Sequence, residues 1–155
     1  MQKIYIGADH RGYALKHELA TSLQQEGHEV EDLGNTVLNA HDDYVEFAQK
    51  VARSVVADTQ SLGIVICGSG IGVSVVANKV TSVRCALVTN LEQAHHARES
   101  DNCNVIALAA DTTTAADAKE FVAQFIKTEY VVEERRERRL VQISVLEEQE
   151  RTRNA

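Results

Sequence analysis

Residues 62–78, LGIVICGSGIGVSVVAN, restrict the possible fold more than any other stretch of this chain. Leu62, Ile64, Val65 and Ile66 form a short apolar, mostly β-branched run that is typical of a buried strand. Three glycines alternate with small residues directly after this run, and then an apolar helical pattern begins. A strand that turns so tightly into a helix is typical of a parallel α/β sheet whose loop N–H groups face an anion.

Cys67 ends this predicted strand and therefore lies at the start of the following helix. The positive end of a helix stabilises a thiolate, which makes Cys67 a candidate base or nucleophile near neutral pH. Two other interpretations stay open on these residues alone: Cys67 is a small buried apolar residue, or the glycines bind a dinucleotide. The dinucleotide interpretation is the weaker one, because its fingerprint is G-x-G-x-x-G in the first strand-helix unit with an acidic residue about twenty positions on.

The rest of the chain alternates short apolar strands with helical patterns. Leu15, Leu19 and Leu23 repeat at helical spacing after the first strand, and Asn90 is placed to cap a later helix. This alternation predicts a three-layer α/β/α sandwich with a five-stranded parallel, Rossmann-like sheet and a C-terminal helix. The strands are expected at residues 3–7, 29–33, 62–67, 83–88 and 104–108. After the helix that carries the three leucines, the other helices are expected at residues 43–58, 72–79, 91–99, 111–127 and 133–150.

Composition narrows the class of protein. At 155 residues, with 44% hydrophobic and 25% charged residues, the chain fits one domain over residues 1–155. Its apolar runs are far shorter than the ~20 residues that span a bilayer, and residues 1–3 lead straight into a strand, so we expect a cytoplasmic protein away from membranes. A net charge of −7 argues against nucleic acid as a partner. The three cysteines lack metal-ligand spacing, so neither a metal site nor a disulfide framework is expected.

A second strand-to-helix turn, ADHRG at residues 8–12, also carries polar side chains. Asp9 and His10 follow the first predicted strand, so they converge with Cys67 if the two strands are neighbours in the sheet. For Asp9, capping of the next helix is the alternative role. The adjacent pair His95-His96 lies on a predicted helix, where neighbouring side chains point about 100° apart, so we interpret both as solvated or interface residues.

Four arginines crowd the start of the last predicted helix in an otherwise acidic chain; they are Arg135, Arg136, Arg138 and Arg139. The pair Arg135 and Arg139 shares one helical face and is placed to bind a phosphate from two sides. Cations at a helix N-terminus oppose its dipole at a cost of a few tenths of a kcal/mol each, so a compensating anion is expected. That anion is either a bound phosphate or the neighbouring carboxylates, which are Glu133, Glu134 and Glu137.

Taken together, these segments resemble the family of ribose-5-phosphate isomerase B and galactose-6-phosphate isomerase. The matching segments are GADHRG, ICGSGIGVSVVANK, RESDNCNV and the C-terminal arginines, in the family's order and spacing from Lys3 to about Glu147. The resemblance implies an aldose-ketose isomerase that acts on a sugar phosphate through a cis-enediolate, with no metal and no cofactor. It also implies a homodimer whose active sites lie between the subunits, with a dimer of dimers as the larger alternative.

The resemblance assigns roles to the residues of both turns. Cys67 becomes the general base that moves a proton between C2 and C1 of the open-chain sugar, assisted by Ser69. Asp9 and His10 hold sugar hydroxyls. Backbone N–H groups after the cysteine form the anion hole for the enediolate. The residues of this hole are Gly68, Gly70, Ile71 and Gly72.

Ser100 and Asp101 depart from the family pattern. Ser100 takes the position of the family's ring-opening histidine, and Asp101 that of the asparagine that follows it. A serine does not titrate near neutral pH, so three routes to ring opening stay open. They are Asp101, the displaced histidine His96 one helical turn earlier, and the uncatalysed reaction.

The expected phosphate site also departs from the family pattern. Asp111 aligns with an arginine that contacts phosphate in the family, so it reverses a charge beside the anion site. Arg135 and Arg139 match the family's phosphate-binding pair, expected to reach across from the partner chain, within a register of about one residue. The expected substrate is ribose 5-phosphate; the alternatives are galactose or allose 6-phosphate, or a sugar-phosphate-binding relative with impaired catalysis.

Overall fold

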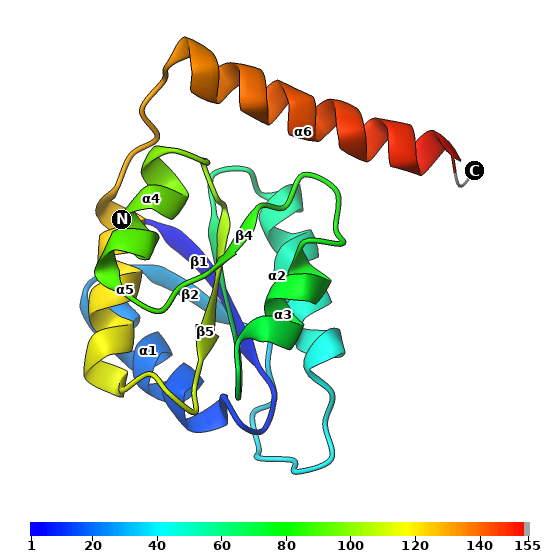
Figure 1. Cartoon of the computed structure of the whole chain (residues 1–155). Helices are drawn as coiled ribbons and strands as arrows, with labels where there is room; N and C mark the ends of the chain where they lie inside the picture. The colour runs from blue at the N-terminus through cyan, green and yellow to red at the C-terminus, as the bar shows by residue number, and fades with distance from the viewer. Residues whose placement is uncertain (154–155) are drawn as a thin grey trace.

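The computed structural model describes residues 1–153 and contains the predicted five-stranded parallel sheet (Figure 1). The strands run in the order β2-β1-β3-β5-β4, and every neighbouring pair is parallel. Every residue of β3 and β5 is buried, as expected for a parallel sheet that is covered on both faces. The strands are β1 (Lys3–Ala8), β2 (Glu29–Asp32), β3 (Leu62–Cys67), β4 (Cys85–Leu87) and β5 (Val105–Ala109).

Helices cover both faces of this sheet, which confirms the three-layer sandwich. The helices are α1 (Tyr13–Gln25), α2 (Tyr44–Ala57), α3 (Ile71–Ala77), α4 (Leu91–Glu99), α5 (Ala115–Lys127) and α6 (Glu134–Arg153). Helices α2 and α3 pack on one face, and α1, α4 and α5 on the other (Figure 1). Helix α6 lies outside both layers, beyond the end of the sheet (Figure 1). Among residues 1–153, no helix is both long and apolar enough to cross a bilayer.

The core has two parts, one on each face of the sheet. Along β3, Ile64 and Ile66 join the cluster under α1, α4 and α5, whereas Val65 and Cys67 join the cluster under α2 and α3. This alternation follows from the two-residue period of a strand. The buried Cys67 side chain therefore faces the α2 and α3 layer at the last position of its strand.

Strands β1 and β3 are neighbours, which brings the two polar turns together. Ala8 pairs with Ile66, and the backbone N–H of Asp9 donates to the carbonyl of Ile66 at 3.3 Å. Strand β2 lies on one side of β1, and β3 lies on the other side. The direction in which successive strands are added to the sheet therefore reverses at β1. Such a switch point leaves a crevice at the carboxyl ends of the strands, where α/β proteins bind ligands.

One helix boundary that the sequence predicted at the site end of the sheet was wrong. The helix expected from residue 111 begins at Ala115, because Thr114 caps it by accepting the N–H of Asp117 at 3.1 Å. Residues 111–113 consequently form a turn beside the Cys67 loop, which puts Asp111 on a loop and not on a helix.

Helix α6 is longer than the sequence suggested. The sequence predicts a helix over residues 133–150 and a frayed helix end from Leu146 to Ala155, but the helix continues to Arg153. Charged residues dominate this last part, and Arg151 pairs with Glu148 at 2.7 Å one turn away. Pairs at this spacing stabilise an isolated helix by a few tenths of a kcal/mol. Residues 154–155, the end of the expected tail, lie outside the described part of the chain.

Candidate active site

The loop after β3 provides a row of unoccupied backbone donors next to a thiol. Cys67 is 4% exposed at the end of β3, and Gly70 has a left-handed φ of 71°. A Cβ built on Gly70 would lie 2.5 Å from Leu87 Cδ1, so only glycine fits there. Within residues 1–153, the N–H groups of Gly68, Ser69 and Gly70 donate to no acceptor. This arrangement suits an oxyanion near the thiol.

Helix α3 begins at Ile71, and Ser69 precedes its N-cap residue Gly70. The Ser69 hydroxyl accepts the N–H of Ile71 at 3.3 Å, and both residues are exposed. Gly72, one residue further on, lies against the ring of Tyr44, where an added Cβ would come within 2.7 Å of Cζ. The expected anion-hole residues are therefore contiguous and adjoin Cys67, whereas their roles in catalysis stay predictions.

Asp9 shapes the turn after β1. Its Oδ1 accepts the N–H groups of Arg11 at 3.0 Å and Gly12 at 3.1 Å, so it stabilises the turn into α1, close to the alternative role considered above. Its other carboxylate oxygen receives no hydrogen bond from any described residue. That oxygen is free to accept a hydrogen bond from a hydroxyl group of a ligand.

His10 is held by Asp42, a residue that the sequence analysis did not single out. Asp42 Oδ1 lies 2.8 Å from both the backbone N–H and Nδ1 of His10, and Asn35 donates to Asp42 Oδ2 at 2.8 Å. A carboxylate only accepts hydrogen bonds, so Nδ1 of His10 carries the proton. The other ring nitrogen, Nε2, is then the one that can bind a ligand.

Lys16 stabilises the loop that carries Asp42. Its side chain is fully buried, forms an ion pair with Asp32 at 2.7 Å and donates to the carbonyl of Asn35 at 2.8 Å. A buried lysine needs such partners, because an unpaired buried charge is strongly disfavoured. The available sequence signal was that Lys16 lies three residues before Leu19, on the apolar face of α1.

Arg11 and Asp111 form an ion pair over the Cys67 loop. The Arg11 guanidinium donates to Asp111 Oδ2, and a Cβ built on Gly68 would lie 2.7 Å from Arg11 Cζ and 2.8 Å from Asp111 Oδ2. The backbone of Asp111 is fixed as well, because its N–H donates to the carbonyl of Gly68 at 3.0 Å. The negative charge that the sequence analysis placed at position 111 is therefore paired with a cation.

Four of the expected site residues lie at the other end of the sheet; they are Ser100, Asp101, Arg135 and Arg139. Ser100 ends α4, and Asp101 follows it before β5 starts. Since β5 runs from this end to the level of Cys67 over five residues, the two groups are separated by roughly 16 Å of strand. Helix α6 lies beyond the same far end (Figure 1). A single chain therefore brings together only the residues around Cys67.

The arginine cluster divides into structural and exposed members. Arg136 is buried; it donates to the carbonyls of Glu99 at 3.0 Å and Val131 at 3.2 Å, and it pairs with the carboxylates of Glu99 and Glu133. Arg135 is exposed and pairs with Glu133 at 3.1 Å. Arg139 is exposed and has no carboxylate partner within residues 1–153. Neighbouring glutamates thus neutralise two of the four cations.

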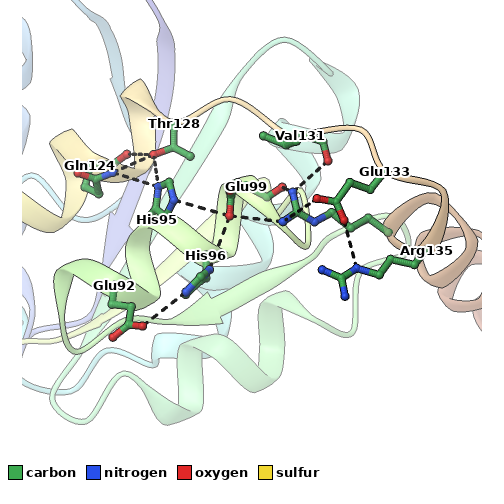
Figure 2. Close-up of polar contacts among 10 residues, drawn as sticks. Glu92, His95, His96, Glu99, Gln124, Thr128, Val131, Glu133 and Arg135 are labelled. Carbon is green, nitrogen blue, oxygen red and sulfur yellow. Dashed lines mark hydrogen bonds and ion pairs between the residues drawn. The ribbon is translucent and has the colours of Figure 1, made fainter.

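Figure 2 shows the rings of His95 and His96 both directed toward the Glu99 carboxylate. His95 Nε2 lies 3.6 Å and His96 Nδ1 3.8 Å from Glu99 Oε2, while His96 Nε2 lies 3.6 Å from Glu92. The His96 side chain is 55% exposed. It lines a cavity of about 410 Å³ together with Asp101. Two of the three alternatives for ring opening therefore share one cavity.

The other two cysteines are poor candidates for a base. Burial raises the pKa of the Cys103 thiol to about 11, with the carboxylate of Asp101 adding to the effect. Burial also raises the pKa of Cys85 far above its ordinary value. Both thiols therefore stay protonated at neutral pH.

Comparison with known proteins assigns the family. The family model described as Ribose/Galactose Isomerase matches residues 4–143. Ribose-5-phosphate isomerase B of Mycobacterium tuberculosis is 42% identical over 153 residues, which cover 99% of this chain and 93% of the relative. Ribose-5-phosphate isomerase B of Escherichia coli is 35% identical over 130 residues, covering 84% and 87%.

A solved structure supports the same family assignment. The structure of ribose-5-phosphate isomerase B from Mycoplasma genitalium with bound ribulose-5-phosphate has a TM-score of 0.91 and 37% identity, and the match covers 94% of this chain and 96% of that one. The chain therefore belongs to the ribose/galactose isomerase family, as its motifs predicted. The expected activity, that of an aldose-ketose isomerase, is confirmed with it.

Proposed function

We propose that the chain interconverts ribose 5-phosphate and ribulose 5-phosphate with Cys67 as the general base. The observation that carries this proposal is the position of Cys67 at the switch point, directly before three N–H groups that have no acceptor within residues 1–153. All the relatives compared above are named ribose-5-phosphate isomerase B, which favours this substrate over galactose or allose 6-phosphate.

The proposed reaction moves one carbon-bound proton of the open-chain sugar from C2 to C1 and one hydroxyl proton between the oxygens of these two carbons. The Cys67 thiolate removes the proton from C2, and the electron pair of that C–H bond shifts toward the C1 carbonyl to give a cis-enediolate. The N–H groups of Gly68, Ser69 and Gly70 stabilise the negative oxygen of this intermediate. Cys67 then returns the proton to C1, and the proton of the C2 hydroxyl passes to the negative C1 oxygen, so that C2 becomes the carbonyl carbon of the ketose. Asp9 and His10 orient the sugar through its hydroxyls.

A second copy of the chain completes the site in this proposal. The four residues at the far end of the sheet are too distant to meet Cys67 of their own chain, but a twofold partner would present them to it. Helix α6 also exposes apolar side chains that need a partner, at Val141, Val145 and Leu146. Arg139, which has no carboxylate partner within residues 1–153, is then available for the substrate phosphate. The dimer of dimers and the cytoplasmic location stay predictions.

A coupled assay of the purified protein tests this function. We expect turnover of ribose 5-phosphate, weaker or no turnover of galactose and allose 6-phosphates, and at least a thousandfold loss of kcat in Cys67→Ala, on the order of what acid-base catalysis contributes. The matched control is Cys85→Ala, which removes a thiol that stays protonated. Full activity of Cys67→Ala would rule out the cysteine base. Calorimetric binding of ribose 5-phosphate by the native chain without turnover would instead favour a binding protein with impaired catalysis.

A further inference from the structure

A second cavity, of about 510 Å³, opens at the amino ends of the strands, opposite the Cys67 loop. Leu62 lines it at the start of β3, Val55 near the end of α2, and Thr59 in the turn that follows α2. Arg84 and Arg98 also line this cavity and bring two positive charges to its wall. No residue assigned above to the isomerase site lines this cavity, so its chemistry requires a separate explanation.

Both arginines in this wall are held by neutral acceptors. Arg84 donates from Nε and Nη2 to the carbonyl of Asn102 at 3.1 and 2.7 Å, and from Nε to the carbonyl of Asp101 at 3.0 Å. Arg98 donates from Nη1 to the side-chain oxygen of Asn102 at 3.0 Å and to the carbonyl of Cys103 at 2.7 Å. These contacts fix two guanidinium groups around the same residue, Asn102.

Neither cation has a counterion among the described residues. No carboxylate of residues 1–153 lies within ion-pair distance of Arg84 or Arg98, and none lines the cavity. Arg98 Nε is buried and has no hydrogen-bond partner. Burial lowers the pKa of the Arg98 guanidinium, and the neighbouring charge of Arg84 acts in the same direction. In a chain with a net charge of −7, two adjacent cations without an anion are unusual.

We propose that this cavity is a second anion site, and that it binds a phosphate monoester of a small polar metabolite. Two guanidinium groups in one wall match the several oxygens of a phosphate, which arginine binds through parallel N–H donors. The Asn104 amide already accepts the N–H of Arg84 and donates to the carbonyl of Ser82, and the Gln2 amide nitrogen donates to the carbonyl of Gln60. The side-chain oxygen of Gln2 and the apolar side chain of Leu62 are therefore left for the body of the ester. The volume lies in the range of small-molecule sites. This proposal does not depend on the isomerase mechanism.

Titration of the ¹⁵N-labelled protein with inorganic phosphate tests the proposal, because NMR separates the two ends of the molecule. We expect saturable shifts of the Arg84 and Asn104 amides and of the Arg98 Nε–H, separate from any shifts at Gly68 and Gly70. A variant that disturbs no arginine contact is Thr59→Glu, since Thr59 is exposed and makes no described hydrogen bond. The new carboxylate should weaken phosphate binding at this cavity at least tenfold and leave isomerase activity unchanged.

Two controls make the result decisive. The variant Thr59→Gln adds nearly the same volume without charge and should bind phosphate as the native chain does. The variant Arg53→Gln changes the net charge by the same amount as Thr59→Glu, at an exposed position on α2 outside the cavity. Equal weakening by Arg53→Gln, unchanged binding in Thr59→Glu, or shifts that chloride reproduces at the same ionic strength would each overturn the proposal.

Discussion

The Arg11 guanidinium donates to the Asp111 carboxylate directly beside Gly68, so an ion pair covers the loop that carries Cys67. Both side chains are partly exposed, at 57% and 40%. Ion pairs of this kind contribute little to stability, about 0–1 kcal/mol. The pair therefore breaks at low cost when another anion approaches Arg11, and Asp111 then competes with that anion for the same guanidinium.

Variants of this pair should change substrate affinity in opposite directions. In Arg11→Met, the Asp111 carboxylate is left unpaired beside the site, and we expect KM for ribose 5-phosphate to rise about tenfold, equivalent to ~1.4 kcal/mol. In Asp111→Asn, Arg11 is released and KM should fall. Steady-state kinetics measures both, with thermal melting as a check that stability changes little. A shift of KM in the same direction in both variants would contradict competition between Asp111 and the substrate.

Asp42 should matter for activity although it need not touch the substrate. It accepts three hydrogen bonds, from two groups of His10 and from Asn35, and the amide in Asp42→Asn would place a donor against one of these donors. We expect kcat/KM to fall at least about tenfold, because loss of a hydrogen bond to a charged group costs roughly 1.5–3 kcal/mol. The control is Asp43→Asn, an exposed neighbour without a side-chain hydrogen bond among residues 1–153. Equal activity of the two variants would count against a fixed His10.

His96 is our choice for ring opening, because Ser100 does not titrate near neutral pH and His96 lines a cavity with Asp101. Replacement by glutamine should lower kcat on ribose 5-phosphate by roughly a hundredfold, as loss of an acid-base catalyst does. The control is His95→Gln, since His95 Nδ1 lies within 3.3 Å of Thr128 and Gln124 and serves the packing of α5. Full activity of His96→Gln, with loss in Asp101→Asn, would transfer the role to Asp101.

Lys16 should contribute more to stability than any surface lysine. Its removal in Lys16→Met leaves Asp32 without its ion pair and frees the loop that carries Asp42, so we expect a loss of about 3 kcal/mol in the free energy of unfolding. Lys50→Met removes an exposed ion pair with Glu46 on α2 and should cost less than about 0.5 kcal/mol. Denaturant unfolding of both variants measures the difference. Similar losses in the two would show that burial does not set the contribution of Lys16.

Local sequence patterns were sufficient to predict most of the fold. Apolar periodicity and the Asn90 cap predicted the helix over residues 91–99 with the bounds it has, and the Asn90 side chain accepts the N–H of Gln93 at 2.9 Å. The glycine-rich turn after Cys67 was equally readable, because a left-handed residue and a close approach of Leu87 require glycine at position 70. The start of α5 was missed because Thr114, and not Asp111, supplies the cap.

The sequence by itself determined the sheet, the thiol at the end of β3 and the family, because these depend on residues close together in the chain. The tertiary structure decided which distant charges meet: Asp42 with His10 across 32 positions, and Asp111 with Arg11 across 100. It also separated the predicted site residues into two groups at opposite ends of the sheet. Loop conformation and strand order set these relationships, and neither leaves a periodic signal in the sequence, since each depends on the packing of the whole chain.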